Sequence, residues 1–99
     1  MKIPTKTLQK ATRQFNKFRF PEVKANVLKN QNGFLKVKFT GAVAPFACCF
    51  DENFIDYTYY IKDLSPFDLE IKTIKRKKIN VFIVTYKIKL NFIIPNGVK

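Results

Sequence analysis

Apolar residues recur at helical spacing in two segments of the chain, residues 5–18 and 51–64. The apolar positions of these two segments are Leu8, Ala11, Phe15 and Phe18, and Phe54, Tyr57, Ile61 and Leu64. The 3-4-3 spacing places each set on one face of a helix. Pro21 and Ser65-Pro66 follow the two segments, and Asp51 is a candidate N-cap for the second. The pattern therefore predicts two amphipathic helices.

Alternating apolar and polar residues predict two β-hairpins. One strand starts at Val23 and the next contains Leu35, with Asn32-Gly33 as the turn between them. Alternation resumes at Leu69, and the last strand is predicted from Ile79 to beyond Leu90, after a turn at residues 75–78. The residues expected to face the helices are the odd-numbered ones: Val23, Ala25, Leu35, Val37, Phe39, Leu69, Ile71, Val81 and Ile83.

The order of these elements, α-β-β-α-β-β, predicts a single α+β domain over residues 1–99. Such an order favours an antiparallel sheet with both helices on one face. The apolar positions of the two halves correspond at an offset of 46 residues. This correspondence indicates two helix–hairpin units, followed by a C-terminal tail over about residues 91–99.

The residue types present favour a binding protein without catalysis. The chain has no His, and its two cysteines, Cys48 and Cys49, are adjacent and cannot build a four-ligand zinc site alone. Its three glycines are too far apart for a phosphate-cradling loop. We expect no cofactor, no metal and no small-molecule substrate. Glu52 and Asp56, which share a helix face, leave a metal-dependent nuclease as a thin alternative.

The sequence carries no recognisable signal peptide and no apolar run long enough to span a bilayer. With two cysteines that we expect to be reduced, these features predict an intracellular protein with no membrane partner.

A net charge of +12 changes this picture most, because it predicts an anionic partner. Nucleic acid, bound through phosphates without strong sequence preference, is the leading candidate; the alternative is that the charge only keeps a Phe-rich chain in solution. The candidate binding residues are Lys75, Arg76, Lys77 and Lys78 at the predicted hairpin tip, supported by Lys36, Lys38, Lys87 and Lys89.

The two predicted helices carry opposite charges. The first has a stripe of four cations opposite its apolar face, Lys6, Lys10, Arg13 and Lys17, whereas residues 51–70 hold six acids and one lysine. The stripe is either an ordinary solvated face or a phosphate-binding one. Alternatively, the helices pair within the chain, or the acidic helix of one copy contacts a basic surface of another in a homodimer or filament.

An apolar row is predicted on the outer sheet face of the last strand: Phe82, Val84, Tyr86, Ile88 and Leu90. Three interpretations are open, namely self-association, cover by another part of the chain, and stacking of nucleic-acid bases. A self-associating interaction protein, using this row and the charged helices, is therefore the second functional hypothesis.

The composition, with no His or Trp and many Lys, Ile, Phe and Asn residues, is similar to that of small orphan proteins of archaeal filamentous double-stranded DNA viruses. The resemblance covers the whole chain and implies an intracellular viral protein. It also implies high heat stability, from which the low Glu count and the eight Asn residues depart.

Overall fold

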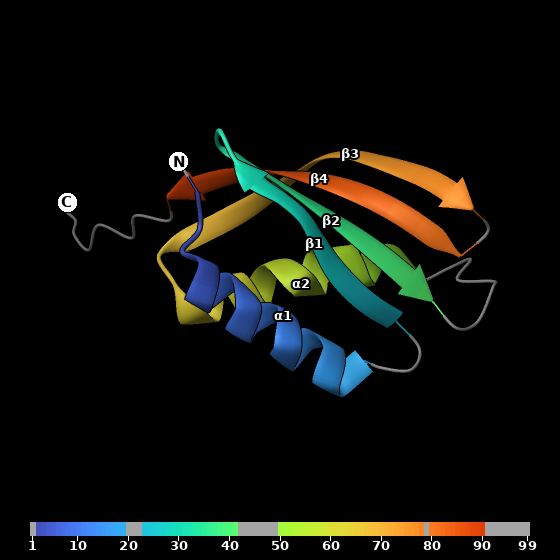
Figure 1. Ribbon diagram of the computed structural model, residues 1–99, viewed down its shortest axis with the longest axis horizontal. Coiled ribbons are helices and arrows are strands. Elements are labelled where there is room, and N and C mark those ends of the chain that lie inside the picture. The colour runs from blue at the N-terminus through green and yellow to red at the C-terminus, as the bar shows by residue number, and fades with distance from the viewer. Residues whose placement is uncertain (1, 20–22, 42–49, 79, 91–99) are drawn as a thin grey trace.

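The computed structural model describes residues 2–19, 23–41, 50–78 and 80–90, apart from the side chains of residues 50 and 51. Over these residues the chain forms two helices and four strands (Figure 1). They are α1 (Thr5–Arg19), β1 (Val23–Gln31), β2 (Phe34–Gly41), α2 (Phe50–Leu64), β3 (Phe67–Lys78) and β4 (Val81–Leu90). The predicted α+β class and order of elements are confirmed.

The four strands form one antiparallel sheet in the order β1-β2-β4-β3. Both helices lie against the same face of the sheet, as Figure 1 shows. The buried core fills the space between the two layers. Its members are Ile3, Leu8, Ala11, Phe15, Val23, Ala25, Leu35, Val37, Phe39, Phe54, Tyr57, Ile61, Leu69, Val84, Tyr86 and Ile88.

Three aromatic rings at the centre of the core join α1, β2 and α2. The ring centroids of Phe15 and Tyr57 lie 5.4 Å apart, and those of Phe39 and Tyr57 lie 5.6 Å apart, both edge-on. Phe15 and Phe39 complete the triangle at 5.8 Å. Edge-on pairs add about 0.5–1.5 kcal/mol each beyond the burial of their area. The triangle therefore fixes both helices on the sheet.

Two buried tyrosines hydrogen-bond within this core. Tyr86 donates its hydroxyl to the carbonyl of Phe54 at 2.8 Å, and the hydroxyls of Tyr57 and Thr12 lie 2.6 Å apart. Burial raises the pKa of Tyr57 to about 12, against a smaller opposing effect of the Thr12 bond. Burial, and then the nearby Tyr57, also raise the pKa of Tyr86. Both phenols are therefore neutral in the folded chain at physiological pH.

Side-chain amides attach the N-terminal segment to the edge strand β1. Asn16 donates to the carbonyl of Ala25 at 3.0 Å and accepts from its N–H at 2.7 Å. Asn30 bonds the carbonyl and N–H of Ile3 in the same way, at 2.7 and 3.1 Å. Edge strands expose unpaired backbone groups. The side chain of Asn16 thus makes the two hydrogen bonds to the backbone of Ala25 that a neighbouring strand would otherwise make.

The first hairpin has the predicted turn. Asn32 and Gly33 have φ angles of 56° and 82°, both in the left-handed region that the favoured two-residue hairpin turns require. The carbonyl of Gly33 accepts a hydrogen bond from the N–H of Ile88 at 2.8 Å. The turn is therefore also held against β4.

The second hairpin differs from its prediction. Lys75, Arg76, Lys77 and Lys78 were expected at its tip, but all four belong to β3. Lys75, Arg76 and Lys78 pair with Ile83, Phe82 and Val81. The pairing is interrupted by irregularities between Ile71 and Thr73 and between Arg76 and Lys78. A run of four cations is compatible with a strand here because β3 is an edge strand, where lysines reach water and discourage unwanted pairing.

The predicted facing of β4 is also wrong. Val84, Tyr86 and Ile88 are buried under the helices, Phe82 packs against the same core, and Leu90 is 42% exposed. Val81 and Ile83 were expected on the helix side, but they alternate with these residues and face away. Intrachain cover thus explains the apolar row, and Val84, Tyr86 and Ile88 offer no surface for another molecule.

A β-bulge is the physical reason for this reversal. The β1–β2 pairing has one irregularity, between Val27 and Lys29, whereas the β3–β4 pairing has two. The extra residues lie in β1 and β3, and each one shifts by one position the residues that the partner strand places opposite the core. The second hairpin has one extra residue more than the first, so the facing of β4 is reversed relative to that of β2. The 46-residue offset thus holds for Ala25 and Ile71, but their partners Phe39 and Tyr86 are 47 residues apart.

Smaller differences occur at the ends of elements. Phe18 was expected in the core but is 69% exposed, because it lies in the last turn of α1, and Leu64 is only partly buried. α2 begins at Phe50, one residue before the predicted cap Asp51, whose side chain lies outside the described residues. The predictions for Pro21, the cysteines, Ile79 and residues 91–99 also fall outside the described part of the chain.

The buried phenol of Tyr57 predicts sensitivity to alkaline pH. In the unfolded chain it ionises near pH 10, whereas in the fold its pKa is about 12. The free energy of unfolding should therefore fall between about pH 10 and 12, by up to about 1.4 kcal/mol per pH unit from this group. Urea unfolding over this range should show a shallower fall for Tyr57→Phe. Thr12→Val removes the same hydrogen bond but keeps the phenol, so an equally shallow fall in that variant would contradict the explanation.

Candidate nucleic-acid interface

The sheet face opposite the helices carries six lysines on three neighbouring rows. We call these residues the six-lysine face: Lys24, Lys29, Lys36, Lys38, Lys75 and Lys78. Their facing follows from the pairing, because each lies on the same side as residues that alternate with the buried core positions. No helix of the described chain covers this side of the sheet (Figure 1).

The strand pairing sets the spacing of these cations. The three rows across β1, β2, β4 and β3 read Lys24–Thr40–Val81–Lys78, Asn26–Lys38–Ile83–Lys75 and Lys29–Lys36–Thr85–Thr73. Neighbouring strands lie about 4.8 Å apart, and residues two apart along a strand are about 7 Å apart. The backbone positions of Lys36 and Lys38 are thus about 7 Å apart, and Lys38 and Lys75 are separated by one strand. The result is an array of positive charges across three rows of the sheet.

The described acids lie away from these rows. They are Glu52, Asp56 and Asp63 on the exposed side of α2, and Asp68 and Glu70 at the start of β3. The Nζ atom of Lys89 is 3.5 Å from Glu70, and that of Lys62 is 4.0 Å from Asp68. On the outer sheet face, the charged residues of the three rows are therefore all lysines, whereas charges of both signs meet around Lys87, Lys89 and Glu70.

The eight cations singled out in the sequence fall into different places. Lys36, Lys38, Lys75 and Lys78 come together on the six-lysine face, although Lys75 and Lys78 were expected at a hairpin tip. Lys87 and Lys89 share the outer face but lie beside the acids, with Lys87 directly opposite Glu70. Lys77 lies at the second irregularity of β3. Arg76 is on the helix side, where its guanidinium lies 5.5 Å from the centroid of the Phe82 ring.

Sequence reasoning missed Lys29 and Phe34 as members of this region, and it placed Lys24 on the outer face without counting it among the candidate binding residues. Lys24 lies between the buried residues Val23 and Ala25, so the alternation in the sequence already indicates that it faces outward. Lys29 has the opposite parity and reaches the face only through the bulge after Val27, for which the sequence has no signal. The ring of Phe34, the first residue after the hairpin turn, is on the outer face and 45% exposed.

A shallow hollow of about 370 Å³ lies on this face next to the hairpin turn. Lys29, Lys36 and Phe34 line it, together with Gln31, Asn32 and Thr85. It therefore combines two ammonium groups, which bind phosphate, with one ring on which a flat base can stack.

Lys29 and Lys36 are directly opposite each other on paired strands. Like charges in this position destabilise a sheet by some tenths of a kcal/mol, up to about 1 kcal/mol. Arg19 provides a contrast, because it forms an ion pair with Asp56 and donates to the side-chain oxygen of Asn53 at 2.9 Å. An anion bound between Lys29 and Lys36 would relieve their repulsion.

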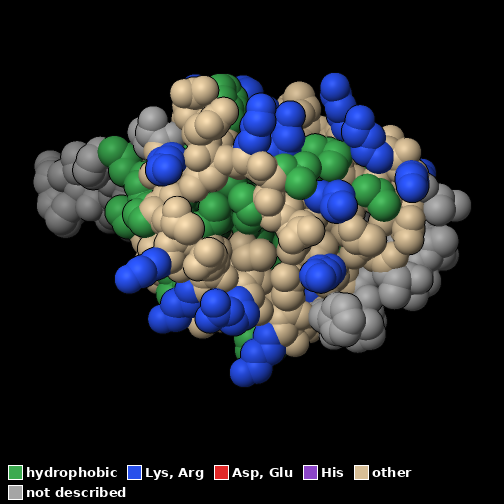
Figure 2. Space-filling model, viewed as in Figure 1, with side chains coloured by type: hydrophobic (Ala, Val, Ile, Leu, Met, Phe, Trp, Pro, Cys, Tyr) green, Lys and Arg blue, Asp and Glu red, His purple; other side chains and the backbone are tan. Residues whose placement is uncertain are grey.

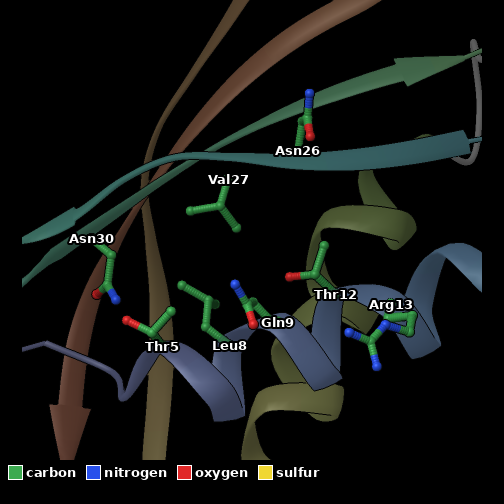
Figure 3. Close-up of a pocket in the computed structure, with 8 residues that line it drawn as sticks. All are labelled: Thr5, Leu8, Gln9, Thr12, Arg13, Asn26, Val27 and Asn30. Atoms are coloured by element: carbon green, nitrogen blue, oxygen red, sulfur yellow. The ribbon is translucent and has the colours of Figure 1, made fainter.

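A second hollow, of about 590 Å³, lies between α1 and β1. Figure 3 shows Leu8 and Val27 directed toward each other across it, while Asn26 points away on the far side of β1. Two of its polar side chains already have partners, because Thr12 bonds Tyr57 and Asn30 bonds Ile3. This hollow is therefore mainly a consequence of how α1 attaches to the edge strand.

Within the described residues, no group of three or more His, Cys, Asp or Glu side chains could hold a metal ion. No helix in the same residues is long and apolar enough to cross a membrane. Comparison of the chain with protein-family models, with curated proteins and with solved structures finds no match.

The opposed lysines predict a stabilising substitution. Lys29→Glu replaces a repulsive pair with an attractive one, so the free energy of unfolding at low salt should rise by about 0.5 kcal/mol. Lys24→Glu is the matched control, because it makes the same charge change on the same strand opposite Thr40. Urea unfolding at low and high salt measures both. An equal gain in the two variants would mean that general charge reduction, and not the Lys29–Lys36 pair, is responsible.

Proposed function

We propose that the protein binds nucleic acid through the six-lysine face. The observation that carries this proposal is that three adjacent rows of an open sheet face hold six cations and, among the described residues, no acid. Solubility alone would be served equally well by mixed charges, as at Lys87, Lys89 and Glu70 on the same face. A surface of one sign attracts a polyanion and releases its counterions on contact.

The chemistry of the face favours contacts to phosphates over reading of bases. Lysine binds phosphate as a point charge and carries little sequence information there. Nothing on the outer face resembles the aromatic platforms of proteins that stack several bases, since Phe34 is the one aromatic residue among its described positions. The proposed binding is therefore tolerant of sequence, and one unpaired base could stack on Phe34.

We also propose that the two halves are helix–hairpin units related by an approximate two-fold axis. Two observations support this. The strand order β1-β2-β4-β3 reads the same when the halves are exchanged. Val37 and Val84, which are 47 residues apart as Phe39 and Tyr86 are, pair with each other at the centre of the sheet. The six lysines do not follow this symmetry, because Lys36 and Lys38 correspond to Ile83 and Thr85 at this offset.

Two matched pairs of lysines test the nucleic-acid interface. Lys36→Gln with Lys38→Gln removes two neighbouring cations of the six-lysine face from β2. Lys87→Gln with Lys89→Gln removes two cations at the same spacing from β4, beside the acids. Binding of a short fluorescent DNA duplex is followed by anisotropy over a series of salt concentrations. The steepness of log K against log salt falls by about 0.9 for each phosphate that the protein no longer neutralises.

We expect the β2 pair to lower this steepness by about 2 and to weaken binding at low salt by about tenfold or more. The β4 pair should change both quantities less. Equal effects of the two pairs would place binding elsewhere. No measurable binding of duplex or single-stranded nucleic acid by the natural protein at low salt would exclude the proposed function.

A further inference from the structure

The outward side of α1 is a stripe of cations for which the described residues show no ion pair. Lys6, Lys10, Arg13 and Lys17 lie opposite the buried positions of α1 at about 100° per residue, and all four are exposed. Figure 2 shows Lys and Arg side chains over α1 and β1, and among the described residues no Asp or Glu is visible on this face. The one described ion pair between the helices uses Arg19 and not the stripe. Of the two open interpretations, pairing of the helices within the chain is thus seen at Arg19 and Asp56, while the described residues show no such pair for the stripe.

The outward side of α2 is acidic and partly apolar. Glu52 and Asp63 are exposed, and the side chain of Asp56 is 35% exposed despite its pair with Arg19. Between these acids, Ile55 and Tyr59 are 46% and 53% exposed. A hollow of about 320 Å³ on this side is lined by Arg19, Asp56, Tyr59, Tyr60 and Asp63. Arg19 already pairs with Asp56 in this hollow, and Asp63 with the rings of Tyr59 and Tyr60 can receive a further cationic side chain there.

The two charge patterns match when the helices run antiparallel. With Lys6 opposite Asp63, Arg13 falls opposite Asp56 and Lys17 opposite Glu52, because both sets are spaced by seven and then four residues. Lys10 then falls opposite Tyr59, where an ammonium group can lie over the ring. All four stripe cations thus meet a carboxylate or an aromatic ring in one alignment.

From this match we propose that two copies of the chain form a two-fold dimer through the outward faces of α1 and α2. Within one chain the helices are antiparallel neighbours (Figure 1), and Thr12 contacts Tyr57, one residue from Arg13 and Asp56. Rotation by 180° about an axis parallel to the helices keeps each residue at its level along that axis. It therefore places α1 of the second copy antiparallel over α2 of the first, near the alignment that the charges require.

The same rotation places α2 of the second copy over α1 of the first, so both contacts form together and the assembly closes at two copies. Ile55 and Tyr59 become covered in this arrangement. The sheets lie on the outside, and their six-lysine faces point in opposite directions. If the proposed function holds, the dimer can contact two nucleic-acid segments at once, but the dimer itself does not depend on that function.

Charge reversal with rescue tests the dimer. The α1 variant carries Lys6→Glu and Lys17→Glu, and the α2 variant carries Glu52→Lys and Asp63→Lys. In a dimer of either variant alone, like charges face each other at both mutated pairs, positions 6 with 63 and 17 with 52, so each variant should be monomeric. In an equimolar mixture, the mixed dimer has opposite charges at these pairs in both helix contacts, so the dimer should return. Light scattering at low salt measures the mass, and far-UV circular dichroism checks that each variant is folded.

We expect the natural protein and the mixture to have twice the chain mass of 11.6 kDa, and each variant alone to have that mass. The natural dimer should dissociate as salt is raised, because salt screens exposed charges. A natural protein that is monomeric at high concentration would overturn the proposal. So would variants that stay dimeric, folded variants that fail to combine, or species that grow beyond two copies.

Binding of a short duplex is measured on the same samples. Neither variant alters the six-lysine face, so loss of the dimer with retained duplex binding separates the two proposals. A monomeric natural protein that binds duplex would leave the proposed function standing. A dimer that binds no nucleic acid would leave the assembly standing.

Discussion

The two helices cover only one side of the sheet, and the rest of the structure depends on this constraint. Both helices pack against the same face, so each strand must send its large apolar residues to that side. The ring triangle of Phe15, Phe39 and Tyr57 joins the two layers. The opposite face carries mainly polar residues, more than half of them lysines, with Phe34, Val81 and Ile83 as apolar exceptions. Core and candidate interface are thus two consequences of one arrangement, since the alternation that buries Val37 also exposes Lys36 and Lys38.

Much of this arrangement could be predicted from the sequence. The spacing of Leu8, Ala11 and Phe15 defines α1, and Asn32-Gly33 defines a turn whose left-handed backbone few other residues adopt. The facing of β4 could not be predicted, because the extra bulge lies in β3 and shifts by one residue which positions of β4 are paired with the core residues of β3. No residue type marks the irregularities of β3. The prediction therefore failed at Tyr86 and Val84 although the strand itself was found.

In the candidate interface, too, regular alternation could be predicted from the sequence and the effect of bulges could not. Lysines that alternate regularly with core residues, such as Lys36 and Lys38, could be placed on the outer face from the sequence, whereas Lys29 reaches the face only through a bulge. Arg76 was expected at a hairpin tip, but it belongs to β3 and lies on the helix side, where its guanidinium lies over the ring of Phe82. Charge also separates along the fold. The cations of α1 and of the outer sheet face point away from each other, and the described acids lie on α2 and at the start of β3. Our two proposals rest on this separation: one surface for a polyanion and another for a second copy of the chain.

The claim that the open sheet face holds nucleic acid is tested most directly by NMR. A ¹⁵N-labelled sample is titrated with a short DNA duplex, and the shift of each backbone amide is followed. We expect the largest changes at Lys24, Lys29, Lys36, Lys38, Lys75 and Lys78, with small changes around Lys87 and Lys89. Changes concentrated on Lys6, Lys10, Arg13 and Lys17 of α1, with the sheet unaffected, would contradict the assignment of the interface to the sheet.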